Sequence, residues 1–366
     1  MNKGIGIVSF VLSLLIGCGQ NPVSEQSAFN SKEQKSEFIS KIEPLIEDYI
    51  SLDIFSGVVL IADSGQNIFH KAYGLADRDT GKTNELNTLF DIGSMNKTFT
   101  RIVVKQLEEE GKLKLTDRLL DYVPGFKDER AKAITINHLL EHQSGFGDYH
   151  NEGYFDLPLE ERTLNAIVER AKDYELHFSP GDEDAYSNLG YVIIGKVIEV
   201  VTDKSYFENV NDRIVAKLDL KNTYLNNFKG LESRIAKGYL YTPLGALELN
   251  SAIQDIPNPD GGFLSTTEDI QKFYHSYYFD TTLVSESSKE ADPYFQYLKD
   301  LPKGKAASAA GGFDGFNSVY LQILEPDLSI IVFANMDEPV AERIGLDILA
   351  LYRGEETQKP SLPAIQ

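Results

Sequence analysis

Ser94 and Lys97 are a pair of residues in this 366-residue chain whose types and spacing could do chemistry. Residues three apart on a helix lie on the same face, so the lysine amine can reach the serine oxygen. A serine hydroxyl is a weak nucleophile until a neighbouring base takes its proton, and a lysine held in a cleft can help. The pair therefore suits attack on a carbonyl. The Ser-x-x-Lys spacing is expected about once by chance in a chain this long, so a helix N-cap serine beside a surface lysine is the ordinary alternative.

A helix after Ser94 would hold this pair in place. Residues 98–111 carry apolar side chains at the spacing of an amphipathic helix, and Gly111 is a plausible stop. Backbone N–H groups are unpaired at a helix start, and the helix dipole is positive there. We therefore expect Ser94 at a position that favours developing negative charge.

A Tyr-x-Asn pattern supplies further polar side chains. It begins at Tyr149, Tyr186 and Tyr224, so the pattern alone selects no site. Tyr186-Ser187-Asn188 follows a turn at residues 180–181 and leads directly into a helical pattern. A tyrosine beside a lysine ammonium could serve as a base, and Asn188 could hydrogen-bond a substrate amide. The ordinary alternative is a buried tyrosine and a turn asparagine.

A competing pattern, His-x-x-Glu-His, lies at residues 138–142 and matches the inverted zinc peptidases. His138 and His142 could share a metal on one helix, with Glu141 placed to activate water. Residues 143–147 end the helix at once, and a third ligand would be easy to find in any acidic chain. A zinc peptidase is therefore a remote alternative. In the ordinary alternative, His138 packs against a helix and His142 lies near a solvent-facing helix end.

The composition indicates a folded, acidic protein. The formal net charge is −21, from 35 Lys and Arg against 56 Asp and Glu. Nucleic acid and acidic lipid would repel such a chain, so neither is expected as a partner. The sequence has no Gly-x-Ser-x-Gly elbow, phosphate loop or dinucleotide fingerprint, which argues against an α/β-hydrolase or a nucleotide enzyme. No obligate protein partner is inferred.

The N-terminus is predicted to be an export signal. Its apolar stretch, residues 5–16, is shorter than the ~20 residues of a membrane-spanning helix. Residues 15–18 resemble the bacterial lipobox, and Cys18 is the only cysteine in the chain. We expect cleavage before Cys18 and a lipid anchor on it. Gly19, by the same resemblance, favours the periplasmic face of the outer membrane in a Gram-negative host.

Four segments are expected along the chain: a signal peptide at 1–17, a flexible tether at 18–35, a folded domain at 36–353 and a loose tail at 354–366. Strand patterns form one hairpin near each end of the domain, at 57–61 with 68–73 and at 318–324 with 329–334. Helical patterns lie at 36–52, 134–141, 164–171, 189–201 and 340–352.

These patterns predict an α/β (α+β) fold. Both chain ends, about 36–93 and 300–353, would complete one antiparallel sheet flanked by helices. A mainly helical subdomain, about 94–299, would be inserted between them. We expect the catalytic cleft between the two parts.

Five stretches together resemble the serine β-lactamase and penicillin-recognising superfamily, closest to its class C-like, D-peptidase and esterase branch. They occur in the family's order between residues 55 and 335, at 90–97, 134–145, 186–188, 259–267 and 311–318. The ordered set is far more specific than any one member. It also makes residues 138–142 part of a structural helix and turn, which lowers the case for zinc.

The resemblance implies roles for the residues. Ser94 attacks the carbonyl, Lys97 and Tyr186 share the proton transfers, and Asn188 orients the substrate. The backbone N–H groups of Ser94 and of Gly312, beside Gly311 on the edge strand, would form an oxyanion hole.

One position departs from the family pattern. The family's third catalytic motif, which falls at residues 309–311 here, normally begins with Lys or His and has a glycine two residues later. In this chain the first of these residues is Ala309, and the glycine is Gly311. The basic side chain normally helps to bind a substrate carboxylate, so its loss disfavours β-lactam or D-alanyl-D-alanine turnover. Lys303 and Lys305 lie several residues upstream, at ~3.3 Å per extended residue, and are poor substitutes.

The sequence therefore predicts an exported, lipid-anchored serine hydrolase that forms an acyl-enzyme at Ser94. Its substrate would be a small molecule or peptide with an ester or amide bond, as for an esterase, D-peptidase or β-lactamase. No metal or organic cofactor is expected. The alternative from another class is a catalytically weak family member that binds peptidoglycan fragments or another ligand, which Ala309 favours.

Overall fold

A computed structural model describes residues 27–151, 153–241, 247–249, 255–302, 304–337 and 339–361. The expected signal peptide and the lipidation site at Cys18 lie outside these residues. Within them, no helix is both long enough and apolar enough to cross a membrane.

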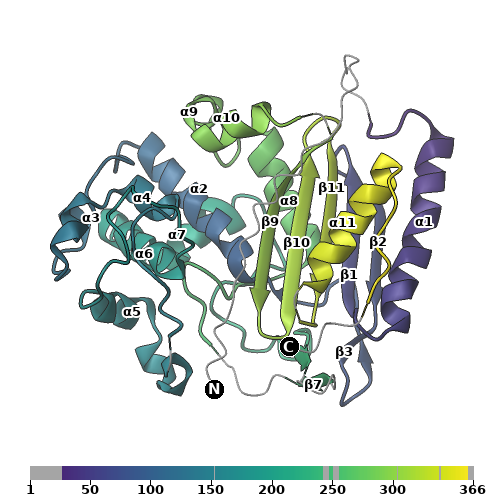
Figure 1. The fold of residues 1–366 in the computed structure, drawn as a ribbon, viewed down its shortest axis with the longest axis horizontal. Coiled ribbons are helices and arrows are strands. Elements are labelled where there is room, and N and C mark those ends of the chain that lie inside the picture. Colours follow the sequence, from purple (N-terminus) through teal and green to yellow (C-terminus); the bar gives the residue numbers. More distant parts are fainter. Residues whose placement is uncertain are drawn as a thin grey trace.

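A five-stranded antiparallel sheet forms the centre of the fold, in the order β2-β1-β11-β10-β9 (Figure 1). Two strands come from the start of the chain and three from its end, as the sequence predicts. Their bounds are β1 Gly57–Asp63, β2 Gln66–Tyr73, β9 Ala306–Phe313, β10 Phe316–Ile323 and β11 Leu328–Ala334. Strand β9 is an edge strand, so its unpaired side can face the turn at residues 93–95, which carries Ser94.

Short strands pair outside this sheet, β3 with β4, β5 with β8 and β6 with β7. Their bounds are β3 Leu75–Asp77, β4 Lys82–Thr83, β5 Phe90–Asp91, β6 Tyr239–Tyr241, β7 Leu247–Leu249 and β8 Leu264–Ser265. The β5–β8 pair matters most for the site because β5 ends two residues before Gly93.

Helices cover both faces of the sheet. Those formed by the chain ends are α1 Lys32–Ser51 and α11 Val340–Arg353, and both lie over one face (Figure 1). The other α-helices of the described residues lie between these chain ends: α2 Asn96–Glu109, α3 Leu119–Tyr122, α4 Ile136–Leu140, α5 Leu164–Ala171, α6 Asn188–Thr202, α7 Tyr206–Val210, α8 Thr267–Phe279, α9 Glu286–Ala291 and α10 Pro293–Lys299.

Alternation along β1 divides the interior into two hydrophobic cores. Val59 and Ile61 pack with α1 and α11, whereas Val58 and Leu60 face the inserted helices. Successive side chains of a strand point to opposite faces, so a strand covered on both sides reads as a continuous apolar run. This explains why all seven residues of β1 are buried.

The segment before α1 differs from the expected free tether. Ser31 caps α1, and three groups upstream or within its first turn bind Asp63 at the end of β1: Ser27 Oγ at 2.6 Å, Ala28 N at 2.8 Å and Lys35 Nζ at 3.0 Å. Residues 27–35 therefore pack on the domain. The polar composition of this segment does not reveal the docking, because the partner residue, Asp63, lies 28 to 36 residues away in the sequence.

Candidate active site

Ser94 lies in a short 3-10 turn, Gly93–Met95, between β5 and α2. Gly93 has a φ of 51°, a conformation that disfavours side chains, and its N–H donates to Asp91 Oδ1 at 2.7 Å. A Cβ on Gly93 would stand 2.6 Å from the backbone nitrogen of Gly312 on β9. The turn is thus pressed against the edge strand, and Ser94 begins a helix as predicted.

The Ser94 hydroxyl has two polar partners. Its Oγ lies 2.6 Å from the Tyr186 hydroxyl and 3.0 Å from Lys97 Nζ. Tyr186 comes from the loop before α6, 92 residues away, so the inserted helices bring the two sequence patterns together. This is the geometry a nucleophile with a neighbouring base requires.

Lys97 is buried and has three acceptors around one nitrogen. Besides Ser94, its Nζ donates to Asn188 Oδ1 at 2.7 Å and to the backbone oxygen of Asp260 at 2.8 Å. An ammonium has three donors and no acceptor, so three acceptors satisfy it completely. The arrangement favours Lys97 as a fixed positive charge and leaves the Tyr186 oxygen as the group that can accept the Ser94 proton.

The edge strand β9 closes against the same turn. A Cβ on Gly311 would come within 1.9 Å of the Ile92 oxygen and 2.8 Å of the Ser94 nitrogen. Ser318 Oγ on β10 lies within 3.0 Å of the Ile92 oxygen and 3.1 Å of the Gly311 oxygen, joining turn and sheet. The backbone at Gly311 and Gly312 is thus adjacent to Ser94, as an oxyanion hole of backbone N–H groups needs.

Ala309 lies on the same strand, two residues before Gly311, and pairs with Tyr320 on β10. Alternation puts Ala309 and Gly311 on one face of β9. The position that carries a basic side chain in the family pattern therefore offers only a methyl group to this side of the sheet.

His142 is a member of the site that the sequence did not reveal. Its ring lies 4.7 Å from the Tyr186 ring, and its Nδ1 accepts the Ser187 N–H at 3.1 Å. Burial, followed by the charge of Lys97, lowers the pKa of His142 to about 4, so the imidazole is neutral at pH 7. The alternative of a solvent-facing helix end was wrong for this residue: it follows α4 with a φ of 58°, and its ring is partly buried against Tyr186 and Tyr191.

The zinc pattern is not assembled as a metal site. Glu141 pairs with Arg101 at 2.8 Å, whereas His138 Nδ1 faces the Thr135 N–H at 3.4 Å and His142 contacts Tyr186. Nowhere in the described part of the chain do three His, Cys, Asp or Glu side chains gather as metal ligands would. The three residues instead support the local fold.

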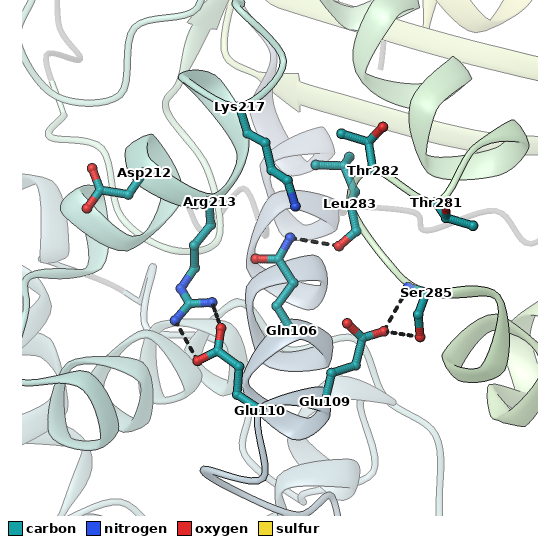
Figure 2. A pocket seen from close by; sticks show the side chains of 10 residues that line it. All are labelled: Gln106, Glu109, Glu110, Asp212, Arg213, Lys217, Thr281, Thr282, Leu283 and Ser285. Carbon is teal, nitrogen blue, oxygen red and sulfur yellow. Dashed lines mark hydrogen bonds and ion pairs between the residues drawn. The ribbon is translucent and has the colours of Figure 1, made fainter.

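A pocket of about 320 Å³ lies at the other end of α2 (Figure 2). Gln106 and Glu109 of α2 and Glu110, directly after the helix, line it opposite Arg213 and Ser285. At 1.5 Å rise per residue, Glu109 is ~20 Å from the start of the helix. This pocket is therefore separate from the cluster around Ser94.

The family model described as Beta-lactamase matches residues 40–353. The teichoic acid D-alanine hydrolase of Staphylococcus aureus is 33% identical over 255 residues, which are 69% of this chain and 59% of that protein. The chain thus spans less than two thirds of that relative's length.

Two solved structures share the fold over most of the chain. FmtA from Staphylococcus aureus superposes with a TM-score of 0.69 at 26% identity, covering 93% of this chain and 96% of that one. A penicillin-binding protein from Bacillus halodurans gives a TM-score of 0.72 at 25% identity, covering 86% and 98%.

Proposed function

The chain belongs to the beta-lactamase family, and from that premise we propose that it is a serine hydrolase whose acyl-enzyme forms on Ser94. The family and the mixed α/β fold predicted from the sequence are both confirmed. The observation that carries the proposal is the placement of one hydroxyl, Ser94 Oγ, between the Tyr186 oxygen at 2.6 Å and Lys97 Nζ at 3.0 Å.

The proposed reaction has two halves. In the first half, Tyr186 enters as its phenolate, with Lys97 beside it as the compensating positive charge. Ser94 Oγ bonds to the substrate carbonyl carbon while its proton passes to the Tyr186 phenolate oxygen. The carbonyl oxygen becomes an oxyanion held by the N–H groups of Ser94 and Gly312. Tyr186 then protonates the leaving group. Water attacks the acyl-enzyme by the same route and restores Ser94.

We propose that the substrate is an ester or amide without a carboxylate beside the scissile bond. Ala309 supports this, because β9 carries no cation at that position to bind such a group. The relative named for teichoic acid D-alanine hydrolysis acts, by its name, on a D-alanine substituent. A D-aminoacyl ester or amide of an envelope polymer is therefore the substrate class we would assay first.

Intact-mass measurement after treatment with a fluorophosphonate tests the nucleophile. We expect one adduct per chain in the wild type and none in Ser94→Ala. Ser285→Ala, at the far end of α2, is the matched control and should label fully. If the wild type formed no Ser94-dependent adduct, the hydrolase proposal would fail, and the non-catalytic ligand-binding alternative would replace it.

The substrate proposal has its own test. Ala309→Lys should raise kcat/KM for a carboxylate-bearing substrate over a neutral ester by about 10-fold, since a hydrogen bond to a charged group contributes about 1.5–3 kcal/mol. An unchanged ratio would show that Ala309 does not set this preference.

We also propose that the protein is exported and anchored through a lipid on Cys18. The lipobox resemblance at residues 15–18 and the single cysteine support this. Cys18→Ser should move the mature protein from the membrane fraction to the soluble one. Equal membrane association of both forms would contradict it.

A further inference from the structure

Asp148 and Lys97 bind opposite ends of the Asn188 side-chain amide. Lys97 binds the oxygen end, and Asp148 binds the nitrogen end. Its Oδ2 accepts the Asn188 Nδ2 hydrogen at 2.8 Å, while Asn188 Oδ1 accepts from Lys97 at 2.7 Å. The oxygen and nitrogen ends of an amide have almost the same shape, so hydrogen bonds alone decide which way it points. An acceptor-only carboxylate on one side and a donor-only ammonium on the other allow one orientation.

His150 holds Asp148 in turn. The second carboxylate oxygen, Oδ1, accepts the His150 backbone N–H at 3.1 Å and lies 3.4 Å from its ring Nδ1. The other ring nitrogen faces Asp255 at 3.8 Å, and the ring stacks on Phe155 at 5.6 Å. Both oxygens of Asp148 thus face donors.

Charge reinforces this geometry. Burial acts to lower the pKa of His150, but its contacts with Asp148 and Asp255 prevail and raise it to about 9. Burial likewise opposes ionisation of Asp148, and His150 outweighs it, so the pKa of Asp148 is lowered. At neutral pH an imidazolium therefore faces a carboxylate, which faces the amide of Asn188.

We infer that Asp148, held by His150, is a positioning residue for the reaction at Ser94. It fixes the amide of Asn188 with its oxygen toward Lys97, so that the ammonium keeps one N–H directed at the nucleophile. The inference rests on the proposed acyl-enzyme. It adds to the site two residues that have no contact with Ser94 themselves.

Asp148→Asn is the sharpest test because it preserves size and exchanges one acceptor for a donor. Whichever way the new amide turns, its NH₂ group meets a donor, either Asn188 Nδ2 or the His150 N–H. Asn188 can relieve the first conflict only by presenting its own NH₂ to Lys97. A misplacement of about 1 Å at a reacting group can reduce a rate about 10²-fold.

The measurement is the rate of Ser94 acylation by a fluorophosphonate, resolved into maximal rate and reagent affinity. We expect Asp148→Asn to lower the maximal rate about 10- to 100-fold, and Asp148→Glu, which keeps two acceptor oxygens, to restore part of it. Asp156→Asn, an exposed aspartate in the same segment, is the matched control and should match the wild type.

A double-mutant cycle separates positioning from general support of the fold. If Asp148 acts through Asn188, then adding Asp148→Asn to Asn188→Ala should lower the rate no further. An unchanged rate in Asp148→Asn, or fully additive losses in the cycle, would overturn the inference. A wild type without an adduct would instead refute the proposed function, so the two failures are distinguishable. Asp148→Glu keeps the test available if Asp148→Asn does not fold.

Discussion

The two ends of α2 arrange polar groups differently. Around its start, Ser94, Lys97 and Tyr186 share donors and acceptors at one hydroxyl, and Lys97 Nζ has three acceptors. At its last turn, Arg213 pairs with Glu110 at 2.5 and 3.1 Å, and Glu109 binds Ser285 at 2.7 Å (Figure 2).

This difference separates a reactive arrangement from a merely polar one. In the first, every group depends on the others, and removing one leaves buried partners unsatisfied. In the second, each pair is complete and partly open to water, where an ion pair contributes about 0–1 kcal/mol. A polar pocket is therefore weaker evidence of chemistry than a shared, buried hydrogen-bond network.

Lys97→Met should have the largest effect. It removes the cation beside Ser94 and strands the acceptors Asn188 Oδ1 and Asp260 O. Removing a preorganised donor that stabilises developing negative charge costs about 10²–10³-fold, so we expect acylation to slow about 10³-fold. Lys217→Met, in the pocket at the far end of α2, is the control and should acylate normally. A loss below 10-fold would show that Lys97 is not part of the machinery.

Gly311→Ala should have the second-largest effect on acylation. Its new Cβ would meet the backbone oxygen of Ile92 at 1.9 Å, and backbone cannot turn aside as a flexible side chain can. The edge strand must move away from Ser94, which removes an oxyanion donor and reduces acylation about 10²–10³-fold. Ala310→Ser, an exposed neighbour on the same strand, should keep wild-type rates. Equal rates in both variants would exclude the proposed oxyanion hole.

The sequence predicts the framework of this site well. Alternating and apolar runs locate both hairpins, and the helical pattern at 164–171 coincides with α5 Leu164–Ala171. Ser94, Tyr186 and Asn188 emerge from motif order, since 92 residues separate the first two and periodicity carries only local information. The structure brings them together around Lys97.

The supporting residues could not be predicted in the same way. The sequence presents His142 only as a metal ligand or a helix end, because nothing in its neighbours indicates that its φ is positive. Asp148 acts on Asn188 across 40 residues of chain. The Tyr-x-Asn pattern at Tyr149 draws attention to the wrong residue, since its neighbours Asp148 and His150 make the contacts that lead to Asn188. Such residues follow from tertiary packing and not from spacing.

Alkaline pH should weaken the Ser94 end of α2. The pKa of His150 is raised from 6.5 to about 9 in the fold, so its contribution to stability is complete below pH 6.5 and is lost as pH rises through 9. At 1.36 kcal/mol per unit, the loss is at most about 3 kcal/mol.

His150→Phe keeps the stack on Phe155 and removes the titrating group. Urea unfolding between pH 6 and 10 should show the alkaline decline in the wild type and in His177→Phe, an exposed control, but not in His150→Phe. An undiminished decline in His150→Phe would assign it to another group.

Acid pH should lower the stability contributed by the Glu110–Arg213 pair at the C-terminal end of α2, but only slightly. Arg213, the largest cause, lowers the pKa of Glu110 to about 2, so this contribution is present above pH 4.5 and is lost as pH falls through 2. The Glu110 side chain is 39% exposed, so solvent screening limits the effect to about 0.5 kcal/mol. Arg213→Met should flatten that acid slope and leave Ser94 labelling at pH 7 unchanged. Arg213 and Ser94 have no hydrogen-bond partner in common, so a labelling rate altered more than about twofold would mean that the two ends of α2 are coupled.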